Sequence, residues 1–202
     1  MHEFELATSA LFRRRSIRRY TAQPVPPSLI RALLEAAIRA PSPHNRQPWR
    51  FVVLSSLARK QLALAMADQL RRDRMRDGDP PEQIERDVAR SIARITGAGA
   101  AVLACMTLQD MDVYPDAFRN GAERWMAGQA VAAAIQNLLL RAVELGLGAS
   151  WMCAPLFCPD VVRATLALPR HWEPQALITL GFPAEEGRER PRRSVDEVTC
   201  WR

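Results

Sequence analysis

The chain has 202 residues, of which 48% are apolar and 25% are charged, and its formal net charge is +6. This composition predicts one globular domain, residues 1–202, and excludes a disordered or fibrous chain. Every basic residue except Lys60 is an arginine, a bias that we attribute to genomic coding. Acidic residues are interleaved with the arginines except near the two ends, so the charge pattern does not favour a nucleic-acid-binding face.

Other features of the composition exclude further classes of protein. No signal-peptide core is present at the N-terminus, and no run approaches the roughly 20 apolar residues of a membrane span, so we predict a cytoplasmic protein without a membrane partner. Cys105, Cys153, Cys158 and Cys200 form no C-x-x-C pair, and the three histidines are far apart. We therefore predict free thiols and no metal site.

Apolar periodicity and turn residues predict alternating helices and short strands. We expect helices over residues 29–39 with Ser28 as N-cap, from Ser55 or Ser56 to about residue 70, around the stripe Ile84, Val88, Ile92 and Ile95, over 125–145, and from Pro159 to 168. We expect strands over residues 50–54, 100–106, 148–152 and 175–182. The elements do not alternate strictly, which favours an α+β fold over a doubly wound sheet.

Three segments need separate comment. Residues 71–83, RRDRMRDGDPPEQ, are charged and interrupted by proline, which predicts a mobile surface excursion. The helix over 125–145 is apolar almost all round, so we expect it to be buried on every side, at a domain centre or in a subunit interface. The tail from residue 187 is basic and then weakly β-like.

The N-terminal stretch RRRSIRRY, residues 13–20, places five arginines in eight residues. Locally, such a cluster is equally typical of a basic targeting tag, a nucleic-acid patch or an anion pocket. Its interpretation depends on the rest of the chain.

Four segments together resemble the nitroreductase family of dimeric FMN-dependent oxidoreductases. They are RRSIRRY at 14–20, APSPHNRQPWRF at 40–51, LGLGASWMCAP at 145–155 and RPRRSVDEV at 190–198. The stretches AAIQNLLL and WMCAPLFCP are also similar to the flavin-binding domain associated with deazaflavin-cofactor biosynthesis. The resemblance implies an α+β sandwich with a central, mainly antiparallel sheet flanked by helices. It also implies an intertwined homodimer with two FMN sites at its interface, with the C-terminal strand exchanged.

The resemblance implies that both chain ends bind the FMN phosphate, a dianion that guanidinium groups bind through charge-assisted hydrogen bonds. Arg14 and Ser16 would contact the phosphate with Arg15 beside them, and Arg18 would reach the pyrimidine edge of the flavin. The distal residues Arg190 and Arg192 would close the site. Arg13 and Arg19 are expected in solvent, and the register of the tail leaves Arg193 open.

Two further segments would border the flavin. By resemblance, Pro41, Ser42 and Asn45 would serve the flavin of the partner subunit, while Gln47 ties down its own loop and Trp49 packs in the core. The second segment would present backbone N–H groups to flavin N5 and O4; it comprises Cys153, Ala154, Pro155 and Leu156. Cys153 has no neighbouring histidine in the sequence, so we do not expect it to be a nucleophile.

The implied activity is ping-pong hydride transfer from NAD(P)H through flavin N5 to a nitroaromatic, a quinone or an unsaturated metabolite. No catalytic side chain is expected, because the flavin carries the chemistry. Residues 71–83 or 109–118 would form a substrate lid, with Tyr114 and Phe118 stacking on the acceptor or packing the loop onto the core. Alternatives are a flavin-fragmenting, benzimidazole-forming enzyme, a non-catalytic flavin binder and a nucleic-acid binder. The choice between NADH and NADPH stays open, because no glycine-rich dinucleotide fingerprint is present.

Overall fold

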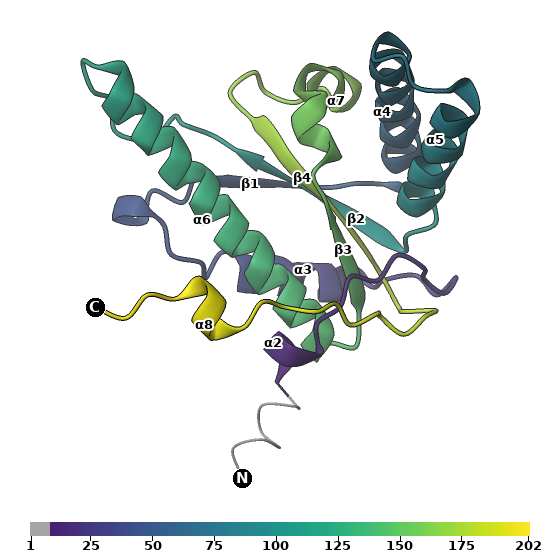
Figure 1. The fold of residues 1–202 in the computed structure, drawn as a ribbon, viewed down its shortest axis with the longest axis horizontal. Helices are drawn as coiled ribbons and strands as arrows, with labels where there is room; N and C mark the ends of the chain where they lie inside the picture. Colours follow the sequence, from purple (N-terminus) through teal and green to yellow (C-terminus); the bar gives the residue numbers. More distant parts are fainter. Residues whose placement is uncertain (1–8) are drawn as a thin grey trace.

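The computed structural model describes residues 9–202, and its elements are labelled in Figure 1. The helices are α2 (Ala10–Arg13), α3 (Pro27–Ala37), η1 (Pro43–Asn45), α4 (Ser56–Arg76), α5 (Pro81–Thr96), α6 (Ala117–Glu144), η2 (Ala154–Phe157), α7 (Pro159–Leu166) and α8 (Val195–Val198). The strands are β1 (Trp49–Val53), β2 (Ala100–Met106), β3 (Gly148–Met152) and β4 (Glu173–Gly181).

The four strands form one sheet in the order β1-β2-β4-β3, and every neighbouring pair is antiparallel. The register pairs Trp49 with Met106 and Val102 with Ile178. The predicted strands are confirmed, with ends that differ by one or two residues for β1 and β4. The α+β class with a central antiparallel sheet is likewise confirmed.

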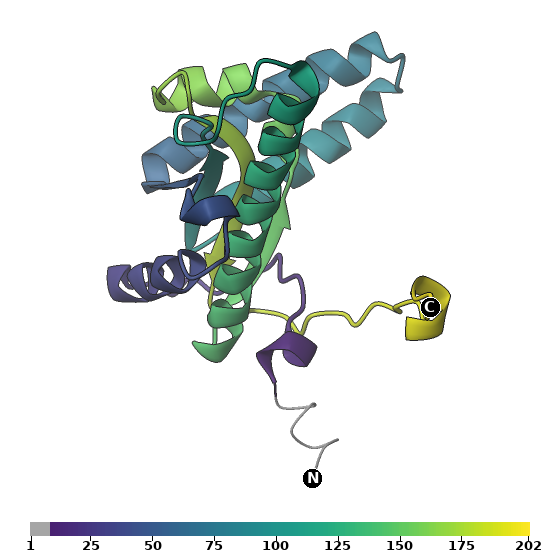
Figure 2. The ribbon, with the colours of Figure 1, turned by 90° about the vertical axis from the view of Figure 1, so that its left-hand side faces the viewer.

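The sheet is the middle layer of three, which explains why β2 is buried along its whole length. Successive strand side chains point to opposite faces. Val102 and Ala104 belong to the cluster that packs against α3 and α6, whereas Leu103 and Cys105 face α4, α5 and α7. Figures 1 and 2 show α6 crossing one face of the sheet and the α4–α5 pair on the other.

The helix starts differ partly from expectation. Ser55 caps α4 by accepting a hydrogen bond from the backbone N–H of Ala58 at 3.1 Å, as predicted. Ser28 does not cap α3, because the helix begins at Pro27, two residues before the predicted start, with Pro26 as N-cap. Proline at the first helical position has a preset φ and lacks only an N–H that would be unpaired there.

The prediction of a mobile excursion at residues 71–83 is wrong. Helix α4 continues to Arg76, and a short turn leads directly into α5. The hairpin is held by ion pairs: Arg71 Nε lies 2.6 Å from Glu85 Oε1, and Arg74 contacts both Asp79 and Asp87. The composition of residues 71–83 indicated a loop, because the sequence does not show that these charged residues pair across two helices. Without that pairing they resemble the solvated charges of a surface loop.

Helix α6 buries one face rather than its whole circumference. Ala134 and Leu138 are fully buried against the sheet and α3, but Trp125 is 75% exposed on the outward face. By length and composition α6 could cross a membrane, although its buried face belongs to the core of this fold. Helix α6 is therefore not buried on every side within the single chain, and burial in a subunit interface stays a prediction.

The sequence indicated a weakly β-like C-terminal tail, and this prediction is wrong. It runs out from β4 across the end of α6 and finishes in the single turn α8, away from the body of the molecule (Figure 2). A capping box between Ser194 and Glu197 forms this turn. Val198 and Trp201 are exposed there.

The N-terminal arm, residues 14–20, lies against the sheet edge and the tail at once. The Ile17 N–H donates to the carbonyl of Ala149 in β3 at 3.0 Å, and Tyr20 bridges to Pro183. The arm approaches so closely that a Cβ on Gly187 of the tail would lie 2.1 Å from the Cβ of Arg15. Glycine at position 187 therefore lets the two chain ends meet.

Tyr20 fastens this arm, and its replacement by phenylalanine is expected to flatten the alkaline decline in stability. Its hydroxyl donates to the Ile17 carbonyl at 2.7 Å and lies 2.9 Å from Thr179 Oγ1. Burial raises the pKa of Tyr20 to about 12. In the unfolded chain the pKa is about 10, so the contribution of Tyr20 is complete below about pH 10 and is lost as the pH rises towards 12.

Denaturant unfolding of both proteins from about pH 8 to about pH 11 measures this difference. At neutral pH, Tyr20→Phe is expected to cost about 1–2 kcal/mol through the lost hydrogen bonds. The difference in the free energy of unfolding between wild type and Tyr20→Phe should narrow above about pH 10, because unfolding of the wild type then begins to release the proton of Tyr20. Parallel stability curves across this range would contradict the assignment.

Candidate functional site

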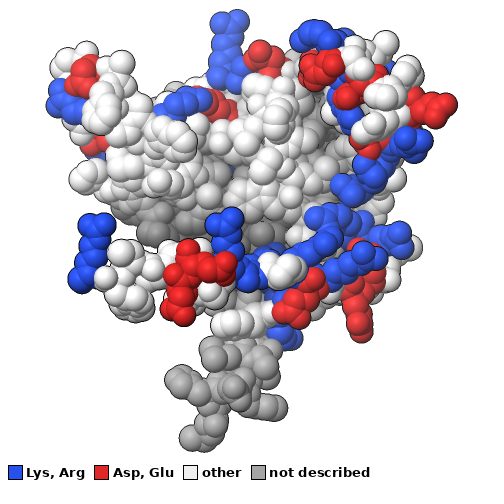
Figure 3. All heavy atoms as spheres, viewed as in Figure 1, with Lys and Arg blue, Asp and Glu red and all other residues white. Residues whose placement is uncertain are grey.

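An open cavity of about 1010 Å³ lies where the N-terminal arm, α5 and the tail meet. Nine arginines and three glutamates line it, from both ends of the chain and from its middle. In Figure 3 the basic side chains form a band along the arm and tail towards α5. Such a concentration of guanidinium groups around a concave surface is suited to an anionic ligand.

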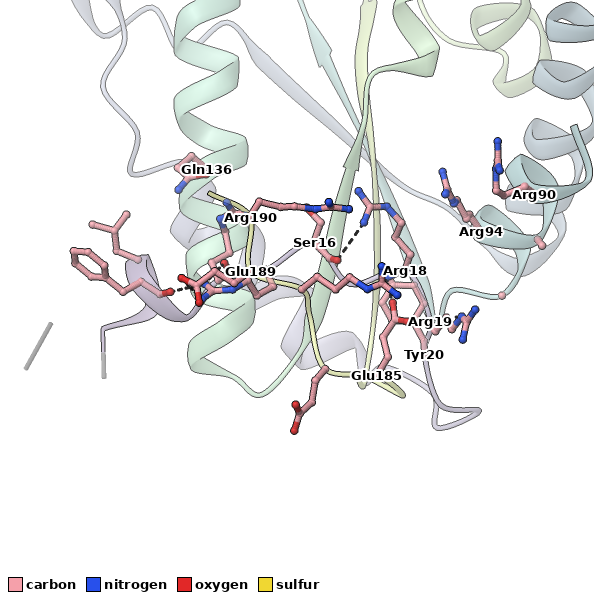
Figure 4. A pocket seen from close by; sticks show the side chains of 18 of the residues that line it. Ser16, Arg18, Arg19, Tyr20, Arg90, Arg94, Gln136, Glu185, Glu189 and Arg190 are labelled. Carbon is pink, nitrogen blue, oxygen red and sulfur yellow. Dashed lines mark hydrogen bonds and ion pairs between the residues drawn. The ribbon is translucent and has the colours of Figure 1, made fainter. Parts of the chain in front are cut away.

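Six of the predicted site residues line this cavity: Arg14, Arg15, Ser16, Arg18, Arg190 and Arg192. Arg193 and Arg13 do not line it, whereas Arg19 does and pairs with Glu185 at 3.7 Å. The segments RRSIRRY and RPRRSVDEV, at opposite ends of the sequence, therefore contribute to one cavity. Figure 4 shows Ser16, Arg18 and Arg190 around it.

The arginines of the arm and tail differ in what holds them. The guanidinium of Arg15 lies 3.2 Å from Glu189 and also donates to the carbonyl of Phe12 at 2.5 Å. The side chain of Arg192 donates to the carbonyls of the two preceding residues. Within residues 9–202, Arg14 and Arg190 have no such acceptor. These two guanidinium groups are therefore available to a ligand.

A smaller cavity of about 250 Å³ adjoins the first, and Arg18 and Arg94 line both. Its other walls come from the end of β3, from Thr179 of β4 and from the predicted residues Cys153 and Ala154. Pro155 and Leu156 lie next in η2 but do not line it. The joined cavities thus have a strongly basic part and a part walled mainly by residues of β3 and of the segment that follows it.

The sequence interpretation missed Arg90 and Arg94 of α5 and Gln136 of α6, and also Arg188 and the three glutamates of the tail segment 185–189, all of which line the large cavity. Gln136 carried a signal, since it is one of few polar residues in an apolar helix. Arg90 and Arg94 carried no such signal in the sequence, because α5 has many charged residues. Only the tertiary structure shows which side of α5 faces the cavity.

Burial lowers the pKa of Arg94, and the nearby cations Arg18 and Arg90 lower it further. Desolvation by burial is the main cause, and repulsion from the two neighbouring guanidinium groups adds to it, while Arg94 has no ion-pair partner within residues 9–202. A bound anion would relieve this repulsion.

The loop with Pro41, Ser42 and Asn45 lies apart from the cavity of its own chain and lines neither pocket. Its backbone is strained, with positive φ at His44, Asn45 and Gln47. Strain of this kind in residues other than glycine concentrates at functional sites. Ser42 Oγ accepts a hydrogen bond from the backbone N–H of Gln47 at 3.0 Å, so the loop holds its own shape.

Neither predicted lid segment, 71–83 or 109–118, lines either of these two cavities. Residues 109–118 are tied to the strained loop by the ion pair of Arg46 and Asp112 at 2.5 Å, and to β1 by the contact of Arg50 with Asp110 at 3.3 Å. Tyr114 stacks beneath the guanidinium of Arg119, with 4.7 Å between the carbon and the ring centroid. Phe118 is 86% exposed, so it does not pack this loop onto the core.

The cysteines provide no second site. Cys105 and Cys158 are buried, and desolvation raises the pKa of Cys105 to about 12, which keeps it an inert thiol. Within the described part of the chain, no group of three or more histidine, cysteine or acidic residues could hold a metal ion.

Comparison with known proteins identifies the class. The nitroreductase family model matches residues 11–182, and this chain belongs to that family. A Thermus thermophilus protein named NADH dehydrogenase is 33% identical over 201 residues, which cover 97% of this chain and 96% of the relative. The 5,6-dimethylbenzimidazole synthase of Rhodospirillum rubrum is 30% identical over 187 residues, 91% of this chain and 85% of that enzyme.

A solved structure agrees with the observed fold. The crystal structure of a Desulfovibrio desulfuricans protein described as a nitroreductase, in complex with FMN, has a TM-score of 0.75 and 30% identity. The match covers 96% of this chain and 94% of that chain. The resemblance stated from the motifs is therefore confirmed at the level of family and fold.

Proposed function

We propose that residues 1–202 form one FMN-dependent oxidoreductase domain that takes electrons from NAD(P)H and passes them to a small organic acceptor. The observation that carries the proposal is the cavity at which arginines of both chain ends meet, with Arg14 and Arg190 unpaired within the described residues. Two relatives support it: one is named NADH dehydrogenase, and another was crystallised with FMN.

The residues present fit an FMN phosphate. A dianion in this cavity would accept hydrogen bonds from guanidinium groups that otherwise lack acceptors, and each such bond contributes about 1.5–3 kcal/mol. Ser16 is an additional hydroxyl donor on the same wall. The adjoining smaller cavity would hold the ring system, between Arg18 and the backbone at Cys153 and Ala154.

When bound, FMN would supply the centre that accepts and returns the hydride. The chain's own residues would bind the cofactor, orient its ring and tune its potential. Arg18 and Arg94 line both cavities, and a cation beside the pyrimidine edge favours the reduced, anionic flavin. No acid–base side chain is assigned, and Cys153 is proposed to act through its backbone.

We further propose a homodimer with two such sites. The outward face of α6 exposes Trp125, and the tail exposes Trp201. Large exposed apolar side chains of this kind are typical of surfaces that a partner covers. In the dimer the strained loop with Pro41, Ser42 and Asn45 would reach the flavin of the partner subunit.

The test is spectroscopic. The purified protein should be yellow, and anaerobic addition of NADH or NADPH should bleach the visible flavin band. Addition of a quinone or a nitroaromatic compound should then restore the band. A yellow protein that neither donor bleaches would be a non-catalytic flavin binder, whereas a colourless protein that takes up no FMN would refute the proposal.

A second candidate is a flavin-fragmenting, benzimidazole-forming enzyme, which the 30% identity to 5,6-dimethylbenzimidazole synthase favours. The two candidates differ in the fate of the cofactor. Aerobic turnover with NAD(P)H followed by chromatography should return intact FMN from an oxidoreductase and a benzimidazole from the alternative.

Tyr114 and Phe118 remain candidates for a lid over the partner's site. If they stack on the acceptor, Tyr114→Ala and Phe118→Ala should each raise KM for aromatic acceptors about 5- to 20-fold, the loss of about 1–2 kcal/mol of stacking and burial. The KM for NAD(P)H should change less. Steady-state kinetics with several acceptors measure this, and unchanged values throughout would remove the lid assignment.

A further inference from the structure

The large cavity has a second basic group, distant from the tail. Arg90 and Arg94 lie one helical turn apart on α5, and both line the cavity. In Figure 4 they lie together on α5, at the opposite side of the site from Arg190 and Gln136. Arg18 of the arm lies near the α5 pair, whereas Arg190 of the tail lies on the other side, so Arg90 and Arg94 face a different part of the cavity from Arg190.

The ion pairs on the α5 side of the cavity leave this side with a net positive charge. One carboxylate, Asp87, contacts both Arg74 and Arg90, and Arg74 also contacts Asp79. Arg94 has no carboxylate partner within residues 9–202. The three glutamates that line the cavity belong to the tail segment 185–189, where Arg15 and Arg19 pair with two of them.

The helix itself does not account for Arg90. A cation in the last turn of a helix is favoured by the helix dipole, which is a sufficient reason for Arg94. Arg90 lies a turn earlier, and its side chain is 59% exposed although it contacts Asp87. An exposed ion pair of this kind stabilises a fold little, so a structural role is a weak reason for an arginine at this place.

We propose that Arg90, together with Arg94, binds a carboxylate or phosphate group on the small molecule that exchanges electrons with the bound cofactor, and thereby makes the site selective for anionic substrates. The inference rests on the proposed function and names a substrate class for it.

The test uses the FMN-loaded protein and substrate pairs that differ in charge. One arm compares 4-nitrobenzoate with the neutral 4-nitrobenzamide at fixed donor. The other compares NADPH with NADH at a fixed neutral quinone, so the two arms separate an anionic acceptor from a donor phosphate. We expect the wild type to prefer the more anionic member of at least one pair by about 3- to 10-fold in kcat/KM, and Arg90→Gln to abolish that preference.

Arg86→Gln is the matched control. Arg86 is exposed on the same helix, lines neither cavity and has no ion-pair partner within the described residues. This variant should keep the wild-type preference. Arg90→Lys, which retains the charge, should keep part of it, and raising the ionic strength should weaken it in the wild type.

An equilibrium readout accompanies the kinetics. Calorimetric titration of 4-nitrobenzoate and of inorganic phosphate should show weaker binding to Arg90→Gln than to wild type or Arg86→Gln for at least one of the two anions. The inference would be overturned if Arg90→Gln and wild type had the same kcat/KM preference for the anionic substrates and the same affinity for 4-nitrobenzoate and for inorganic phosphate. It would also be overturned if Arg90→Gln weakened FMN binding as strongly as Arg14→Ala, because the charge would then serve the cofactor.

Failure of the proposed function has a different signature. A wild type that is not bleached by NAD(P)H contradicts the proposed oxidoreductase before any substrate pair is compared. In that case calorimetry still decides whether Arg90 binds the anion.

Discussion

Arg14→Ala and Arg190→Ala are each expected to weaken FMN binding by about 10- to 100-fold. Both guanidinium groups line the same cavity, and neither has an acceptor within residues 9–202. Removal of a charge-assisted hydrogen bond to a phosphate costs about 1.5–3 kcal/mol, which corresponds to this range.

A double-mutant cycle tests whether the two chain ends serve one anion. If Arg14 and Arg190 share a phosphate, their effects on the FMN dissociation constant should be non-additive by about 0.5–3 kcal/mol. Fluorescence titration of the apoprotein with FMN measures each corner of the cycle. Arg13→Ala and Arg193→Ala are the controls, because neither residue lines the cavity. Strict additivity would place the two arginines on separate ligands.

Gly148→Ala is expected to destabilise the protein by about 1–3 kcal/mol, the usual cost of an overpacked core. The added Cβ would lie 2.7 Å from Ile17 Cγ2 and 2.8 Å from Ile17 Cβ. Ile17 has little room to move, since it is only 8% exposed and its N–H is bonded to Ala149. The arm must therefore move away from β3.

The change should also affect the site, because Arg14, Ser16 and Arg18 flank Ile17 on the same arm. We expect a melting temperature lower by about 2–12 °C, with weaker FMN binding in the folded protein. Gly121→Ala is a matched control, since no atom lies within 4 Å of its added Cβ. It should be neutral or slightly stabilising, as alanine favours helix. Equal melting temperatures for Gly148→Ala and wild type would show that the arm does not rest on β3 in solution.

The cavity's basic character was predictable, but not all of its residues. The motifs RRSIRRY and RPRRSVDEV pointed to Arg14 and Arg190 through their resemblance to the nitroreductase family, because the charge cluster alone fits several kinds of site. Arg90 and Arg94 were not predictable, since α5 has exposed arginines on several sides. Only the packing of α5 beside the arm selects which of them face the cavity.

The helical hairpin of α4 and α5 illustrates the same limit. Its charged residues 71–83 were interpreted as a mobile surface excursion, whereas Arg71 pairs with Glu85 across the two helices. A local pattern does not reveal a partner that lies on another helix. Cross-helix pairing and the proline at the start of α5 keep this segment ordered.

By itself, the sequence determined the family, the core strands and the stretches that border the site. These properties are carried by local patterns, such as alternating burial and short motifs. Only the tertiary structure decided that both chain ends meet α5 at one cavity, while the loop with Asn45 lies elsewhere in the same chain. The physical reason is that a binding site depends on distances between residues far apart in sequence, and these are set by how helices and strands pack.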